Sequence, residues 1–128
     1  CGILFVRGWV QCLFMQNRNW ILESHPDFDL GRFLATLKPI DQVVVAKFLS
    51  NVVQIENLIL APKSWIKPLG VGLFEFRISA DYTLVRIFFT FKKGRIVLLL
   101  GAYDKGADPA NKRQQREISL ARKRLKNG

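Results

Sequence analysis

The chain has 128 residues, which is most simply one domain with one hydrophobic core. Apolar residues make up 49% of it and aromatic residues 12%, contents that exclude an intrinsically disordered protein. Its 20 basic and 10 acidic residues give a net charge of +10, which indicates an anionic partner, either a nucleic acid or an acidic protein.

Cysteine and histidine are scarce. Cys1, Cys12 and His25 are too few for a structural zinc site, and two cysteines in the first dozen residues give no disulfide framework. We therefore expect no metal and no cofactor, and a reducing, cytoplasmic location.

The first 14 residues are apolar around Arg7 and precede the first methionine, Met15. They are too short to span a bilayer and lack a small-residue cleavage site. We expect residues 1–14 to be a leader outside the working fold, a single domain over residues 15–128, and no membrane association.

The N-terminal half predicts one short strand and two helices. Residues 20–23 favour a strand, which His25-Pro26 ends. Apolar residues at positions 30, 33, 34 and 37 predict a helix that Asp27 or Asp29 can cap. Positions 45, 48, 49 and 52 predict a second helix, capped by Asp41, although the valine run at 43–45 leaves a strand possible. Residues 61–70 are expected to be a loop.

The C-terminal half predicts three strands and a helix. Residues 71–79, 82–91 and 95–102 have strand patterns, with turns at 80–81 and 93–94. The unbroken apolar run of the third strand predicts a central position, covered on both faces. Asp108 and Pro109 can cap and begin a helix that continues to Asn127. The expected fold is α+β: a small, mostly antiparallel sheet with two N-terminal helices packed on it and a basic C-terminal helix.

Two arginines, Arg77 and Arg86, lie within apolar strands and require an explanation, because a buried charge is costly unless it is paired. The predicted turns place Glu75 opposite Arg86, Leu84 opposite Arg77, and Gly101 opposite Arg86. Arg77, Arg86 and Tyr103 then share one face, where the glycine would leave room for a concave anion pocket. A purely architectural ion pair between Arg86 and Glu75 is the alternative, whereas Arg77 has no evident carboxylate partner.

The C-terminal helix carries seven cations against one acid, Glu117. This excess favours contact with phosphate, although a solvated face or the helix dipole accounts for part of it. The expected nucleic-acid contacts are Lys63 in the 61–70 loop and, on the helix, Lys112, Arg113, Arg116, Arg122, Lys123 and Arg124. No nucleophile–base pair, phosphate-binding glycine loop or paired-carboxylate motif is evident.

Together these segments resemble type II toxin–antitoxin toxins of the RelE/ParE superfamily, in particular the HigB-like, phage-derived branch. The resemblance covers roughly residues 20–127. It is carried by four pieces in the right order, at residues 67–77, 85–88, 101–106 and 113–122.

The resemblance implies a ribosome-dependent endoribonuclease that cleaves messenger RNA and is neutralised by a cognate antitoxin, often a helix-turn-helix protein. By position, Lys67, Arg77 and Arg86 would bind phosphate and stabilise the transition state, and Tyr103 would orient or activate the 2′-hydroxyl. Many relatives have a histidine where this chain has Leu100. The base is therefore open between Tyr103 and the neighbouring Asp104, and the acid between Lys105 and an arginine. A toxin that binds DNA gyrase, or an inactive prophage relic that binds RNA or antitoxin, are the alternatives.

Overall fold

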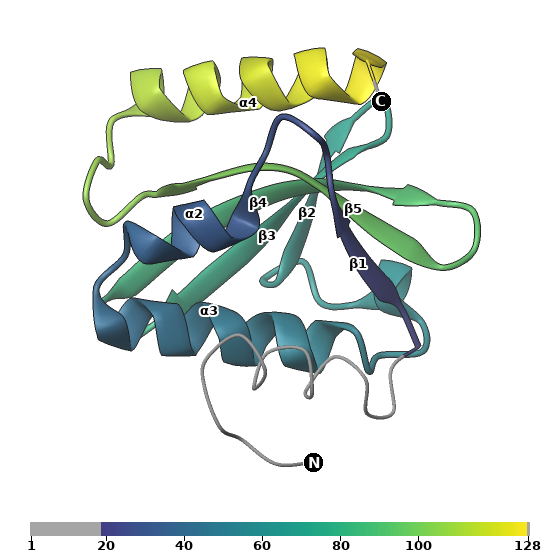
Figure 1. Ribbon diagram of the computed structural model, residues 1–128, viewed down its shortest axis with the longest axis horizontal. Coiled ribbons are helices and arrows are strands. Elements are labelled where there is room, and N and C mark those ends of the chain that lie inside the picture. The colour runs from purple at the N-terminus through teal and green to yellow at the C-terminus, as the bar shows by residue number, and fades with distance from the viewer. Residues whose placement is uncertain (1–18, 128) are drawn as a thin grey trace.

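The computed structural model describes residues 19–127, so the expectation for residues 1–14 concerns residues outside the described part (Figure 1). In chain order the elements are β1 (Ile21–Ser24), α2 (Leu30–Ala35), α3 (Pro39–Val52), the 3-10 turn η1 (Leu58–Leu60), β2 (Ile66–Gly70), β3 (Leu73–Ala80), β4 (Thr83–Lys92), β5 (Ile96–Asp104) and α4 (Asn111–Asn127). Within this part of the chain, no helix is long and apolar enough to cross a membrane.

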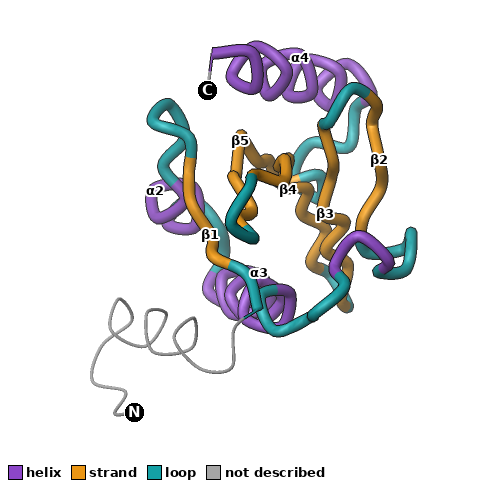
Figure 2. Tube along the Cα trace, turned by 90° about the vertical axis from the view of Figure 1, so that its right-hand side faces the viewer, coloured by secondary structure: helices purple, strands orange, loops and turns teal. Residues whose placement is uncertain are grey.

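The strands form one five-stranded sheet in the order β1-β5-β4-β3-β2 (Figure 2). β1 pairs with β5 in parallel, and the other pairs are antiparallel. The α+β class and the mostly antiparallel sheet are therefore confirmed. β5 lies between β1 and β4, inside the sheet, as its apolar run predicts.

Helices cover both faces of the sheet, with α2 and α3 on one side and α4 on the other (Figure 1). The larger core lies on the α3 side, because the alternate strand residues that point there are aromatic or branched, such as Phe76, Ile87 and Phe89. A smaller core lies on the α4 side, where Ala121 of the helix packs with Leu73 and Leu100.

The helix starts agree in part with the sequence prediction. Asp29 caps α2, since its carboxylate accepts the N–H of Arg32 at 3.0 Å. The expectation that Asp41 caps α3 is wrong. α3 begins at Pro39, whose fixed φ suits the first helical position. Asp41 lies inside the helix, buried, and accepts the hydroxyl of Thr83 at 2.5 Å.

Two further boundaries differ from the prediction. Residues 66–70, expected within a loop, form the edge strand β2, where Pro68 is tolerated because an edge leaves one side unpaired. α4 begins at Asn111 and not at Pro109. The Asp108 carboxylate accepts the N–H of Ala110 at 3.3 Å, in the segment that leads into the helix.

Both hairpin registers differ from the prediction. The first turn is Asp81-Tyr82, with Asp81 at a φ of 51°, and Ala80 pairs with Thr83. In the second hairpin the register shifts between Phe88 and Phe89, which leaves one extra residue in β5, a bulge.

Candidate functional site

Arg77, Arg86 and Tyr103 lie in one row across the sheet. Arg77 of β3 pairs with Arg86 of β4, and Arg86 pairs in turn with Tyr103 of β5. The predicted partners, Leu84 for Arg77 and Gly101 for Arg86, are wrong. The predicted common face is nevertheless confirmed, because side chains alternate with a period of two and each shift moves the partner by two residues.

A buried carboxylate, Glu75, lies among these cations. Its side chain is 1% exposed, and its Oε1 atom is 3.9 Å from the Nε atoms of both Arg86 and Arg77. Lys67 of β2 lies directly opposite Glu75 in the sheet. The prediction that Glu75 lies directly opposite Arg86 is wrong, because Glu75 pairs with Phe88, but the ion pair between Glu75 and Arg86 is present across a diagonal. The expectation that Arg77 has no carboxylate partner is wrong.

Burial sets the proton affinities in this cluster. Loss of solvent raises the pKa of Glu75 above its ordinary 4.5, and the charges of Arg86, Arg77, Lys67 and Lys105 oppose that rise. Burial also raises the pKa of Tyr103, and the negative charge of Glu75 adds to the effect. Tyr103 is thereby held as a neutral phenol, which favours a role as hydrogen-bond donor over the predicted role as base.

Three polar atoms of the cluster have no hydrogen-bond partner within the described residues. They are Oε2 of Glu75, Nε of Arg86 and the hydroxyl of Tyr103. The Arg86 guanidinium makes one weak bond, from Nη1 to the carbonyl of Val85 at 3.4 Å. Buried polar groups are nearly always paired, so this cluster of three unpaired ones is a candidate functional site.

In the described part of the chain, α4 covers the face on which an open pocket was expected. Arg86 is 5% exposed and Tyr103 1%. The Arg113 guanidinium of α4 lies 5.5 Å from the centre of the Tyr103 ring. The space beside Gly101 is also filled: a Cβ atom there would be 3.4 Å from Nη1 of Arg124.

Three of the predicted phosphate-binding cations on α4 make contacts within the protein. Arg122 donates to the carbonyls of Leu69 and Gly70, at 2.6 and 3.0 Å, and Arg124 donates to the carbonyl of Leu100 at 2.9 Å. Arg113 pairs with Glu117 at 2.8 Å and with Asp108 at 3.5 Å. The expected contacts that remain solvent-exposed are Lys63, Lys112, Arg116 and Lys123.

The neighbours Asp104 and Lys105 take different positions. The Asp104 carboxylate accepts the N–H of Ala107 at 3.2 Å and so holds the turn after β5. Lys105 is half-buried, and its Nζ lies 3.4 Å from the side-chain oxygen of Gln114. Lys105 and the exposed Lys67 join Arg77, whose side chain is 39% exposed, as the cations of the cluster that solvent reaches.

A family model described as phage-derived protein Gp49-like (DUF891) matches residues 32–126, most of the chain. The chain belongs to this family. The Gp49-like family is related to the RelE toxin–antitoxin superfamily, so the resemblance found in the sequence is confirmed at that level. No curated protein matches the chain significantly.

The sequence analysis of this Gp49-like protein treated Glu75 as an ion-pair partner of Arg86 and not as a candidate site residue. The available signal was an acid two residues before Arg77, on the same strand face, with Arg86 within diagonal reach across the hairpin. His25 follows the first strand, as the sequence predicts. It is 4% exposed, and its Nε2 atom has no partner within residues 19–127. Among those residues, His, Cys, Asp and Glu side chains do not gather in threes as metal ligands.

Proposed function

We propose that this Gp49-like protein is the toxin of a type II toxin–antitoxin system and an endoribonuclease that cleaves messenger RNA on the ribosome. The observation that supports the proposal best is the excess of cations around Glu75. Arg77, Arg86, Lys67 and Lys105 act electrostatically on this one carboxylate, which leaves the cluster strongly positive next to the Tyr103 hydroxyl. Such a site favours an added phosphate.

The proposed reaction is attack by the RNA 2′-oxygen on the adjacent phosphorus. The 2′-oxygen loses its proton, a bond forms between it and phosphorus, and the bond from phosphorus to the 5′-oxygen breaks. The 5′-oxygen takes up a proton. Charge develops on the phosphoryl oxygens in the transition state, and fixed cations stabilise that charge.

The surroundings of each residue suggest its role. Lys67, Arg77 and Lys105 are the cations that an incoming phosphate meets first, because they are exposed or half-exposed. Glu75 is the proposed proton acceptor, since its raised pKa brings a carboxyl closer to neutral pH, where a base is most effective. Tyr103, held neutral, would donate a hydrogen bond to the reacting phosphate or the 2′-oxygen.

The position of α4 limits the access of RNA to the buried residues of the cluster. Arg86 and Tyr103 are buried, with α4 packed over this face of the sheet. We propose that RNA first binds the exposed cations, and that the start of α4 moves before the buried groups contact the phosphate. Membership of the family suggests an antitoxin partner, for which we propose a helix-turn-helix protein.

Single-turnover cleavage of messenger RNA on programmed ribosomes tests the proposal. We expect Arg77→Gln to lower the rate by about 10²–10³-fold, the usual cost of losing one transition-state donor. Tyr103→Phe, which keeps the ring and removes the hydroxyl, is expected to lower it by at least about 10²-fold. Lys93→Gln, at an exposed lysine of the β4–β5 turn, is the matched control and should cleave normally.

Two results would overturn the proposal that this protein is a nuclease. If the protein arrests growth while ribosome-bound messenger RNA stays intact, a non-enzymatic toxin such as a gyrase inhibitor replaces it. If neither arrest nor cleavage occurs, and RNA or antitoxin still binds, the protein is an inactive relic.

A further inference from the structure

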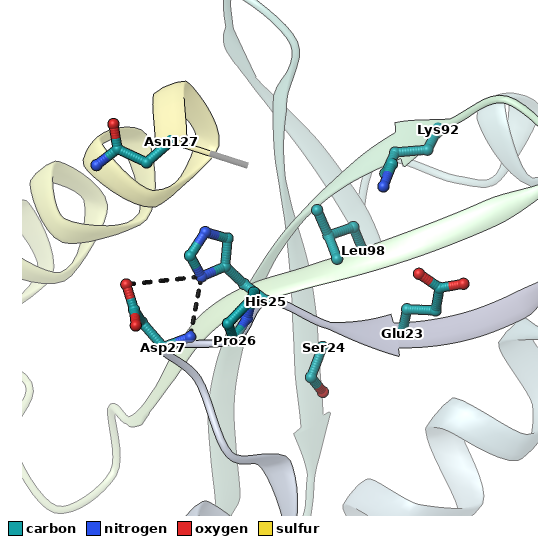
Figure 3. A pocket seen from close by; sticks show the side chains of 8 residues that line it. All are labelled: Glu23, Ser24, His25, Pro26, Asp27, Lys92, Leu98 and Asn127. Carbon is teal, nitrogen blue, oxygen red and sulfur yellow. Dashed lines mark hydrogen bonds and ion pairs between the residues drawn. The ribbon is translucent and has the colours of Figure 1, made fainter.

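A second site lies where β1 ends, on the α4 side of the sheet. A cavity of about 570 Å³ opens there between residues 23–27, Lys92 of β4, Leu98 of β5 and Asn127 at the end of α4 (Figure 3). Its size is that of a small-molecule site. Leu98 belongs to the core cluster under α4, which places the cavity on the same sheet face as the cation cluster.

His25 is the fixed polar group of this cavity. Its backbone is held on both sides, since its N–H donates to the carbonyl of Leu99 and its carbonyl accepts from Phe28, each at 2.9 Å. Its Nδ1 atom accepts the N–H of Asp27 at 3.0 Å, so the proton of the neutral ring is on Nε2. Nε2 is buried and unpartnered within the described residues, and it lies on the side of the ring away from Asp27 (Figure 3).

The lining sets the chemistry of a ligand. The Nε2–H of His25 requires an acceptor, and the Lys92 ammonium favours an anion. The carboxylates of Glu23 and Asp27 accept from an amine, and the largely buried Leu98 forms an apolar floor beneath a flat ring. A nucleotide whose base carries an exocyclic amine has all four features: a ring acceptor, an amine, a flat apolar face and a phosphate.

We propose that this cavity is a nucleotide subsite that holds one base of single-stranded RNA, preferring bases with an exocyclic amine. The inference rests on the proposed function. Arg113, next to Tyr103, and Asn127, at the cavity, lie at opposite ends of α4 and are separated by roughly 20 Å at a rise of ~1.5 Å per residue. The cavity therefore takes a nucleotide some positions away from the bond that is cut.

Most residues that line this subsite lie outside the region that the family model matches. The match covers residues 32–126, whereas five of the lining residues, at 23–27, and Asn127 lie outside it. The cavity is therefore lined largely by residues outside the matched region. It can set this protein's own base preference without altering the cation cluster.

Calorimetric titration of the full chain with AMP, CMP, GMP and UMP tests the inference. We expect AMP, CMP and GMP to bind, and UMP, which lacks the exocyclic amine, to bind at least about 5-fold more weakly. His25→Asn keeps an acceptor for the N–H of Asp27 but removes the Nε2 donor, and should weaken AMP binding about tenfold. Lys92→Gln should weaken it similarly, whereas the matched Lys93→Gln should leave it unchanged.

An uncleavable pentaribonucleotide, 2′-O-methylated throughout, separates RNA from free nucleotide as the ligand. Tighter binding of the pentamer than of AMP, lost in His25→Asn, supports an RNA subsite. Equal or weaker binding overturns it. Absence of binding by every nucleotide at millimolar concentration, or equal affinity of wild type and Lys92→Gln, overturns the site itself. None of these readouts depends on cleavage, so the nuclease proposal can fail independently.

Discussion

Arg86→Met leaves the buried Glu75 carboxylate with Arg77 as its only arginine partner among residues 19–127, and we expect it to destabilise the protein by about 3–5 kcal/mol. Glu75 is 1% exposed and the Arg86 side chain 6%, so water cannot replace the lost charge. Methionine fills much of the volume of the arginine stem, so the loss reflects electrostatics more than a cavity. For a domain of this size it corresponds to a fall of about 10–20 °C in Tm.

Two further variants test whether the uncompensated charge of Glu75 causes this loss of stability. Arg77→Met removes a cation at the same 3.9 Å distance from Glu75, but its side chain is 39% exposed, and we expect a cost of about 1 kcal/mol or less. Adding Glu75→Gln to Arg86→Met should recover at least about 2 kcal/mol, because no charge is then left unpaired. Urea unfolding at pH 7 measures the free energy of unfolding of each variant.

The pH dependence supplies an independent check. Since the folded protein raises the pKa of Glu75 above 4.5, the folded state holds this proton more tightly than the unfolded state. The contribution of Glu75 to stability therefore falls as pH rises from 4.5 through its folded pKa. In Arg86→Met the fall should be larger and extend to higher pH, because loss of the arginine raises the pKa of Glu75 further, and after Glu75→Gln it should be absent. Equal stability of Arg86→Met and Arg77→Met, or no effect of Glu75→Gln on the pH slope, would refute the account of a strained buried cluster.

Two other predictions concern contacts that the structure reveals. Arg122→Gln should cost about 1–2 kcal/mol of unfolding free energy in a denaturant melt, because it removes two bonds to backbone carbonyls, and it should leave the salt dependence of RNA binding unchanged. Lys123→Gln should change the free energy of unfolding by less than about 0.5 kcal/mol and reduce the slope of RNA affinity against salt concentration by about 1. If Arg122→Gln reduces that slope and Lys123→Gln does not, Arg122 contacts phosphate. Thr83→Val should cost about 1–3 kcal/mol, since the buried Asp41 carboxylate loses its only side-chain hydrogen bond within the described residues, and a thermal melt within 2 °C of wild type would contradict this.

The alternation of apolar and polar residues determined which face each strand residue occupies. Arg77, Arg86 and Tyr103 share a face because the side-chain period of a strand is two and each register error was two residues. The register itself depends on turn geometry, such as the positive φ of Asp81, and on the bulge in β5. Neither the turn geometry nor the bulge is marked by a distinctive residue pattern in this chain.

The tertiary structure alone decided what the charged residues do. The sequence shows that α4 is basic and carries an apolar stripe, but Arg122 and Arg124 have the same local pattern as Lys123. Only the position of the docked helix places two of these cations over backbone carbonyls and the third in solvent. The same docking buries Tyr103 and fills the space beside Gly101. Local periodicity fixes the direction of a side chain, whereas its burial and partners depend on segments far away in the chain, which meet only when the helix packs on the sheet.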